Sequence, residues 1–264
     1  MEINQEKTMI DWKKHFDHIY CIHFVEYKER RPELMEELNR VGILDSGIFS
    51  FKYTFRTPLD NVLLNSYNFP RTNGIENFDV PKLNLAMGHY SCIKEALGLE
   101  YKRILILEDD IAFLKDLGEI ERILESSPHY DIELYDKCGT EENWQFFLKN
   151  RPINNDYCGY SLLWCASCYS LNKRGMEHIV KCQETKFNVA DFYTNEFAPY
   201  NDFNGNRQLI YDGVRRAVSI KNIACQKPSK SDTVTEHGDS KWVYKQKGLS
   251  FCGLEPDLYN LGNE

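Results

Sequence analysis

The stretch RILILEDDIAF, residues 103–113, runs four β-forming apolar residues directly into three acids. An uninterrupted Ile-Leu-Ile-Leu run is typical of a strand that is covered on both faces, as in a parallel sheet. In open α/β sheets, ligands bind beyond the carboxyl ends of such strands. The stretch therefore predicts a buried strand whose end carries a site formed by Glu108, Asp109 and Asp110.

Strand and helix patterns alternate on both sides of this stretch. Runs rich in β-formers predict strands at 18–25, 48–56, 130–136 and 161–171, and a last strand within 217–233. Apolar residues at helical spacing predict helices that start after the loop at 29–31, at 83, after Asp116, and after an N-cap at Asn172. Strands that alternate with helices favour an α/β fold with a mostly parallel central sheet.

The chain of 264 residues shows no internal repeat and no low-complexity linker, so one domain is expected. We place that domain at 18–250, after an N-terminal extension at 1–17 and before a C-terminal tail at 251–264. Residues 57–82, which are rich in Asn and Pro, and residues 194–209 are predicted to be loops.

Composition and charge argue against several classes of protein. No run of about 18 apolar residues is present, which excludes a spanning helix. The charged first 20 residues lack the apolar core of a signal peptide. The net charge of −8 disfavours wholesale binding to nucleic acid or to an anionic membrane.

Charge is also unevenly placed along the chain. Residues 108–142 hold twelve acids against three basic residues, a local charge of −9, whereas 221–248 hold six Lys against three acids. One interpretation is two solvated faces of opposite sign. The other is an acidic metal site and a basic phosphate site that the fold brings together.

The nine cysteines form an odd number in no framework spacing, and most lie in apolar runs. Free, buried thiols in a reducing cytosol are the simplest interpretation. Cys165 and Cys168 form a C-x-x-C, but no second pair follows at zinc-ribbon distance.

The three acids at the end of the predicted strand suit a hard divalent cation. Alternate residues of an extended segment point the same way, so Glu108 and Asp110 can share one ion while Asp109 faces elsewhere. Mg²⁺ and Mn²⁺ prefer carboxylate oxygens and substrate phosphates. The alternative is an acidic surface turn in which Asp110 caps a helix.

Other chemistries have less support in the residues. The chain contains no G-x-x-x-x-G-K-[ST] phosphate loop and no G-x-S-x-G nucleophile elbow. The Glu at 108 argues against the D-x-D pattern of an aspartyl phosphatase. Metal-assisted group transfer from a diphosphate donor is what remains.

Four segments in this order resemble glycosyltransferase family 25. They are IYCIHFVEYKERRPELMEELNRVGI (19–43), LAMGHYSCIKEALGLEYKRILILEDDIAF (85–113), WCASCYSLNKRGMEHIV (164–180) and CQKPSKSDT (225–233). Each motif alone is weak, but the ordered set is specific. His23 stands where many members have Asn, and Gly88 replaces the usual Ser before His89.

The resemblance implies a GT-A fold, a Rossmann-like α/β sandwich that binds a nucleotide sugar and Mn²⁺ or Mg²⁺. Members include bacterial lipooligosaccharide galactosyltransferases and collagen galactosyltransferases, which mostly use UDP-galactose. The expected function is therefore inverting transfer of a sugar, galactose, to a glycan or lipid-linked glycan acceptor in surface polysaccharide synthesis. A bacterial cytoplasmic enzyme, at most peripheral to the inner face of the membrane, fits the N-terminus best.

Site residues are carried over by position from the same resemblance. Glu108 and Asp110, with Asp232 as a further ligand, would hold the metal, and Asp109 would lie nearer the sugar or ribose. Asp191, a single acid that follows a short apolar stretch, is the residue expected to deprotonate the acceptor hydroxyl. The donor-binding set is Ile22, His23, Phe24, Arg30, Arg31, His89, Gln226 and Ser231.

For several of these residues, a purely structural role is the alternative. Arg30 could be a surface charge at a helix start, His89 a packing residue, and Asp191 a helix N-cap. For the whole protein, the alternatives are an inactive module that binds nucleotide sugar or glycan, and a metal-dependent phosphohydrolase, which the acids alone would permit.

Overall fold

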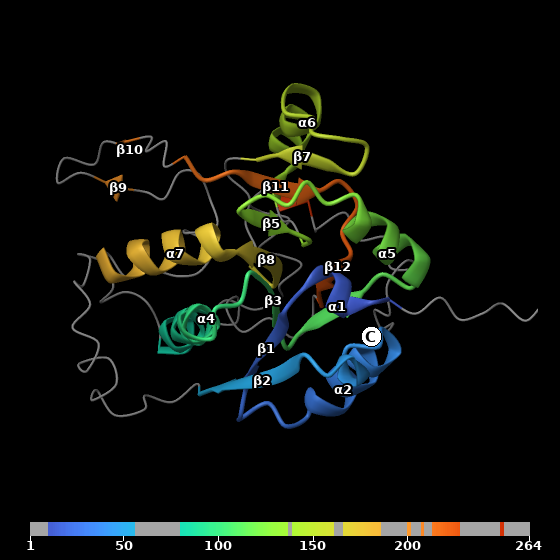
Figure 1. The fold of residues 1–264 in the computed structure, drawn as a ribbon, viewed down its shortest axis with the longest axis vertical. Coiled ribbons are helices and arrows are strands. Elements are labelled where there is room, and N and C mark those ends of the chain that lie inside the picture. The colour runs from blue at the N-terminus through green and yellow to red at the C-terminus, as the bar shows by residue number, and fades with distance from the viewer. Residues whose placement is uncertain are drawn as a thin grey trace, which may run out of the picture.

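A seven-stranded sheet forms the centre of the protein (Figure 1). The computed structural model describes residues 10–55, 80–136, 139–160, 166–185, 200–201, 207–208, 213–227 and 249–250. The strand order is β2-β1-β3-β8-β5-β11-β7. The strands are β1 (His18–Phe24), β2 (Phe49–Thr54), β3 (Arg103–Glu108), β5 (Ile132–Leu134), β7 (Tyr157–Gly159), β8 (Cys168–Asn172) and β11 (Arg216–Ser219).

Five of these seven strands run in the same direction. β1 pairs in parallel with β2 and β3, and β5 pairs in parallel with β11. β8 is antiparallel to both β3 and β5, and β7 is antiparallel to β11. The predicted α/β fold with a mostly parallel sheet is confirmed, and it is consistent with a Rossmann-like sandwich of the GT-A type.

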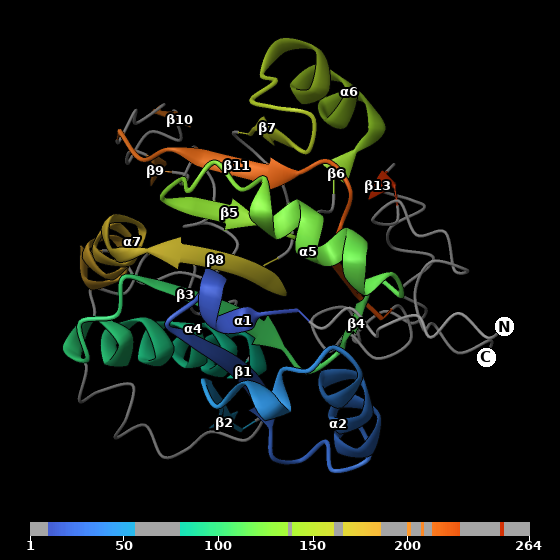
Figure 2. The same ribbon diagram turned by 45° about the vertical axis from the view of Figure 1, so that its right-hand side comes forward.

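Helices cover both faces of the sheet (Figure 2). α1 (Trp12–His15), α2 (Arg31–Arg40) and α5 (Leu117–Glu125) pack on one face, and α4 (Val80–Gly98) and α7 (Lys173–Thr185) on the other. A short 3₁₀ helix, η1 (Leu44–Ser46), follows α2, and α6 (Glu141–Asn150) precedes β7.

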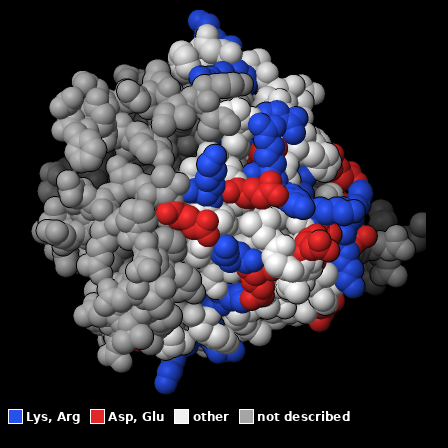
Figure 3. All heavy atoms as spheres, turned by 60° about the vertical axis from the view of Figure 1, so that its left-hand side comes forward, with Lys and Arg blue, Asp and Glu red and all other residues white. Residues whose placement is uncertain are grey.

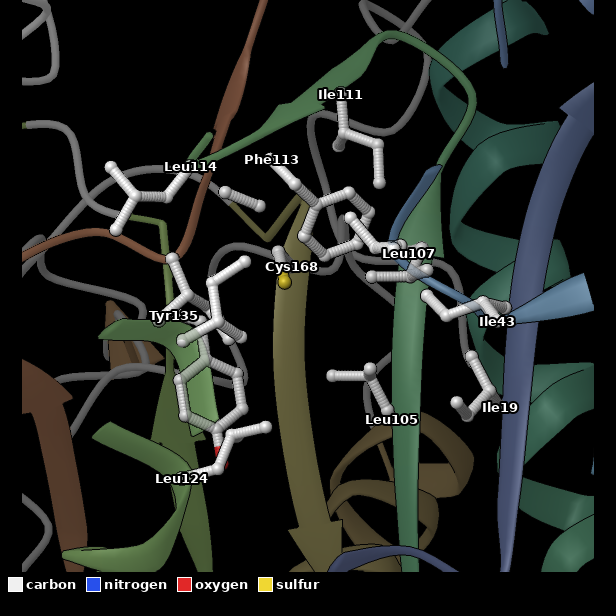
Figure 4. Packing of buried hydrophobic residues seen from close by; sticks show 14 of the residues in the cluster. Ile19, Ile43, Leu105, Leu107, Ile111, Phe113, Leu114, Leu124, Tyr135 and Cys168 are labelled. Atoms are coloured by element: carbon white, nitrogen blue, oxygen red, sulfur yellow. The ribbon is translucent and has the colours of Figure 1, made fainter. Parts of the chain in front are cut away.

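The apolar run of β3 explains why the sheet is covered twice. Leu105 and Leu107 lie in the core beside α2 and α5, while Ile104 and Ile106 lie in the core beside α4 and α7. All four side chains are fully buried. Figure 4 shows Leu105 beside Ile19 of β1, and Leu107 further along β3, near Phe113 and Ile43. Because side chains alternate along a strand, only a run without polar residues can fill both cores.

Three small antiparallel pairs stand outside the main sheet. β4 (Ile111–Phe113) pairs with β12 (Ala224–Gln226), so that Gln226 lies opposite Ile111. The others join β9 (Tyr200–Asn201) to β10 (Arg207–Gln208), and β6 (Gly139–Thr140) to β13 (Leu249–Ser250). The first pair matters for the site, because it brings the chain around 226 next to the acids that follow β3.

The structure differs from the sequence-based boundaries in several places. α4 begins at Val80, inside the predicted loop 57–82, and β9 and β10 lie inside the predicted loop 194–209. Residues 10–17, predicted as part of an extension, supply Ile10, Trp12 and Phe16 to the core beside α2 and α5. The strand expected at 161–171 begins at Cys168, and 161–165 lie outside the described residues. The strand expected at 130–136 is shorter, since only Ile132–Leu134 pair with neighbours.

Helix capping follows the sequence in one case and departs from it in another. Asn172 Oδ1 accepts from the Gly175 backbone N–H at 2.9 Å, which confirms the predicted cap of α7. Asp110 caps no helix: α5 begins after Asp116, whose carboxylate accepts from the Glu119 N–H at 3.1 Å.

The six described cysteines are free thiols: Cys21, Cys92, Cys158, Cys168, Cys182 and Cys225. Burial raises the pKa of the Cys21 and Cys168 thiols, which keeps them protonated and unreactive.

Among the described helices, none combines the length and the apolar character that crossing a membrane requires. On the face drawn in Figure 3, acidic and basic side chains of the described residues neighbour one another. Mixed charge of this kind is typical of a solvated surface.

Gly175 is required where α7 crosses the start of β5. A Cβ atom at this position would lie 2.0 Å from the carbonyl oxygen of Asp131. We expect Gly175→Ala to lower the free energy of unfolding by at least about 1–3 kcal/mol, because the clash is with backbone. Chemical denaturation measures the effect. Gly98→Ala at the end of α4 is the control, because no atom lies within 4 Å of its Cβ position. Stability close to wild type in Gly175→Ala would contradict the close approach.

Candidate functional site

The site lies at the edge of the sheet where the parallel strands end. Glu108 is the last residue of β3, and Asp109 and Asp110 form the turn into β4. The ends of β1 and the start of β8 flank it, because both strands neighbour β3. This is the position that the sequence predicts for the three acids.

Asp110 is a buried acid with one oxygen unused. Gln226 Nε2 donates to its Oδ2 at 3.0 Å, and the Lys227 N–H donates to its carbonyl oxygen at 2.6 Å. Its Oδ1 meets no hydrogen-bond partner among the described residues. Burial, and then the carboxylates of Glu108 and Asp109, raise the pKa of Asp110 well above its ordinary range. The arrangement favours a proton or a cation at this carboxylate.

Glu108 is held by a buried histidine of α4. His89 Nε2 lies 3.2 Å from Glu108 Oε1, and His89 Nδ1 lies 2.8 Å from the Tyr169 hydroxyl of β8. The preceding Gly88 allows α4 to approach the sheet, since a Cβ there would lie 3.0 Å from Ile22 Cγ2. His89 can therefore contact Glu108 because α4, the helix that carries it, packs closely on β1.

Asp109 points toward the loop between β1 and α2. Its Oδ2 lies 2.7 Å from His23 Nδ1 and accepts from the Phe24 N–H at 3.1 Å. Its Oδ1 accepts from Arg30 Nη1 at 3.0 Å. The sequence predicts that Asp109 faces away from the other two acids, and these contacts show what it faces.

An exposed cation–aromatic surface adjoins this loop. The Arg31 guanidinium lies 5.3 Å from the ring centroid of Phe51 and 5.7 Å from that of Tyr53. The two rings stack with centroids 5.8 Å apart, and Tyr53 is 48% exposed. Sequence reasoning missed both aromatics, although the alternation of IFSFKYTFR places them on one face of β2, next to the start of α2.

A second buried acid lies behind Glu108. The Ser167 hydroxyl donates to Asp136 Oδ2, and the Ser167 carbonyl accepts from the Glu108 N–H at 2.8 Å. Asp136 is fully buried just after β5. No sequence pattern indicates this contact, because β8 reaches Glu108 only through the antiparallel pairing with β3.

Most of the described candidates from the sequence come together at this edge. They are Glu108, Asp109, Asp110, His23, Phe24, Arg30, His89 and Gln226. Ile22 lies beneath them, packed in the core beside α4. Asp191, Ser231 and Asp232 lie outside the described residues.

The acids fit a hard cation in charge and in donor type. Glu108 and Asp110 offer carboxylate oxygens. The Oδ1 of Asp110, which has no hydrogen-bond partner among the described residues, is an atom that could ligate a divalent cation. The described residues bring together no group of three or more His, Cys, Asp or Glu side chains with metal-ligand geometry. Substrate phosphates, water or a further residue would have to complete the coordination.

Comparison with known proteins finds distant likenesses to solved structures, among them two transferases. The chain matches no protein-family model and no curated protein. Mannose-1-phosphate geranyltransferase from Thermus thermophilus is similar at 10% identity and a TM-score of 0.35, over 76% of this chain and 73% of that one. A glycosyltransferase involved in the glycosylation of the major capsid of PBCV-1 is similar at 15% identity and a TM-score of 0.38, over 81% of this chain and 94% of that one. Likeness at this level identifies neither a family nor a reaction.

Proposed function

We propose that the protein is a metal-dependent glycosyltransferase that moves a sugar from a nucleotide-sugar donor to a glycan acceptor. The observation that supports this most is the buried Asp110 carboxylate, whose Oδ1 has no partner among the described residues and whose neighbours are two more acids. Such a cluster is stabilised by a divalent cation, and the cation in turn binds phosphate oxygens.

In this proposal the acids, the arginine and the aromatic rings at this edge of the sheet have separate roles. Glu108 and Asp110 would hold Mn²⁺ or Mg²⁺, with Asp232 as a further ligand, and the cation stabilises negative charge on a diphosphate. Arg31 lies at the same edge and can pair with a phosphate oxygen. The exposed ring of Tyr53, backed by Phe51, offers a flat apolar surface against which a nucleobase can stack.

The chemical step would be an inverting displacement. The acceptor hydroxyl attacks the anomeric carbon, the bond from that carbon to the diphosphate oxygen breaks, and the hydroxyl proton passes to a carboxylate base. Asp191 is the proposed base. UDP-galactose as donor, a surface glycan or lipooligosaccharide as product, and a cytoplasmic location rest on the resemblance of the four sequence segments to glycosyltransferase family 25.

A donor screen with released nucleotide as the readout tests the proposal. We expect nucleotide release from a UDP-sugar in the presence of Mn²⁺, and loss of that release when a chelator removes the metal. UDP-galactose is expected to be the best donor. Metal-dependent binding of UDP without any release would instead identify a binding module. Release of inorganic phosphate from simple phosphate esters would identify a phosphohydrolase.

A further inference from the structure

The carboxylate of Asp109 is almost fully committed to one loop of the protein. Its two oxygens accept from three donors: the His23 ring, the Phe24 N–H and the Arg30 guanidinium. An ionised carboxylate offers about four acceptor positions, so little capacity remains for a metal or a sugar hydroxyl. The side chain is 4% exposed, which also limits access from solvent.

The three donors come from both ends of the β1–α2 loop. His23 and Phe24 end β1, whereas Arg30 immediately precedes α2. Between them the chain turns twice, through the Tyr27 N–H to the Phe24 carbonyl at 3.0 Å and the Arg30 N–H to the Tyr27 carbonyl at 3.1 Å. One carboxylate therefore joins the beginning and the end of the same loop to the end of β3.

The Arg30 side chain is fixed from two sides. Its guanidinium stacks over the Tyr27 ring, 4.1 Å from the centroid, and its side chain is only 7% exposed. Its positive charge also favours the ionised form of Asp110. In a site with little water, hydrogen bonds to charged groups are strong and an unpaired charge is costly. Arg30 and Asp109 therefore depend on each other.

We propose that Asp109 is a positioning residue that clamps loop 24–30 against the end of β3, and that it neither ligates the cation nor touches the sugar. The clamp holds Arg30 close to Asp110. It also fixes the position of the first residue of α2, which is Arg31. What the loop is positioned for, a nucleotide donor, rests on the proposed function. The clamp itself does not.

Hydrogen exchange measures the clamp without any substrate. In Asp109→Asn we expect exchange of residues 24–31 to accelerate about tenfold or more, while exchange in α5 stays at the wild-type rate. Arg30→Gln removes one donor and should accelerate the same segment, which decides the matter even if Asp109→Asn fails to fold. Asp116→Ala is the control, because it removes an Asp–backbone hydrogen bond at α5 instead. Unchanged exchange of 24–31 in both clamp variants would overturn the proposal.

Calorimetry with Mn²⁺ alone and with UDP plus Mn²⁺ separates positioning from ligation. We expect Asp109→Asn to bind Mn²⁺ within about threefold of wild type and to bind UDP about 10–100-fold more weakly, because the loop and Arg31 would be misplaced by about 1 Å. Loss of Mn²⁺ binding as complete as in Asp110→Asn would make Asp109 a ligand and overturn the proposal. If the wild-type protein binds neither probe, the proposed function fails, and the exchange experiment still decides the clamp.

Discussion

Asp110→Asn is expected to abolish metal-dependent nucleotide binding and, at the same time, to stabilise the metal-free protein. The two effects have one cause. The Asp110 carboxylate is buried, next to Glu108 and Asp109, with an oxygen that has no partner among the described residues. A group placed at such a cost to stability is typical of a functional site. Removing its charge should relieve that cost and remove the ligand.

The gain in stability should depend on pH. Burial and the neighbouring acids raise the pKa of Asp110 in the folded chain. The folded chain therefore holds this proton more tightly than the unfolded chain, whose Asp pKa is about 3.9. Asp110 then lowers stability progressively as pH rises from about 4 through the raised pKa. Asp110→Asn removes the buried negative charge, so it should remove that decline and raise the free energy of unfolding near neutral pH by about 1–3 kcal/mol.

Calorimetry with UDP and Mn²⁺, together with denaturation of the metal-free protein between pH 4 and 8, checks both effects. Asp116→Asn serves as the matched control, because Asp116 is an exposed helix cap. It should keep nucleotide binding and a stability close to wild type, because Asn caps a helix about as well as Asp. UDP affinity that is unchanged in Asp110→Asn would remove Asp110 from the metal site.

The central strand could be predicted because its signal is local. The run Ile104–Leu107 and the acids after it determine which residues are buried and where the chain leaves the sheet. The position of β8 between β3 and β5 could not be predicted, since strand order depends on pairings between distant segments. For the same reason Asp136 and Ser167, which support Glu108 through β8, have no signature in the sequence.

The role of Asp109 shows the same limit within the site. The prediction that Asp109 faces away from Glu108 and Asp110 assumes alternation along an extended segment, whereas residues 109 and 110 form a turn. Which groups it meets depends on how residues 24–30 fold back onto β3, and no local pattern encodes that contact. At the N-terminus, residues 1–17 are interpreted from the sequence as an extension. The fold instead uses Trp12 and Phe16 as core residues.

Asp191→Asn is expected to lower kcat by about 10²–10⁴-fold, the range that general-base catalysis contributes. The base must be an acid whose carboxylate is not already hydrogen-bonded to another group or needed for the metal. Glu108 is bound to His89, Asp109 to three donors, and Asp136 to Ser167, while Asp110 belongs to the proposed metal site. Each acid that the structure describes at this edge therefore has a hydrogen-bond partner or a proposed role as a metal ligand. The base should come from a different segment.

The end of α7 lies beside α4, the helix that carries His89. Glu184 accepts from the Tyr90 hydroxyl at 2.9 Å and from Lys94 Nζ at 3.1 Å, so α7 ends beside the residue that follows His89. Asp191 lies six residues beyond Thr185, the last residue of α7. Six residues span at most about 20 Å, which limits how far Asp191 can lie from the end of α7.

Steady-state kinetics and donor calorimetry on the same variant test this assignment. Because a base contacts the acceptor, Asp191→Asn should leave UDP affinity close to wild type while kcat falls. Glu196→Gln, an acid five residues further along the same segment, is the control and should keep most of its activity. Product NMR should show an anomeric linkage inverted relative to the α-linked donor. Near-normal turnover in Asp191→Asn, or a loss mainly of UDP affinity, would assign the base to another residue and make Asp191 a helix cap or a donor contact.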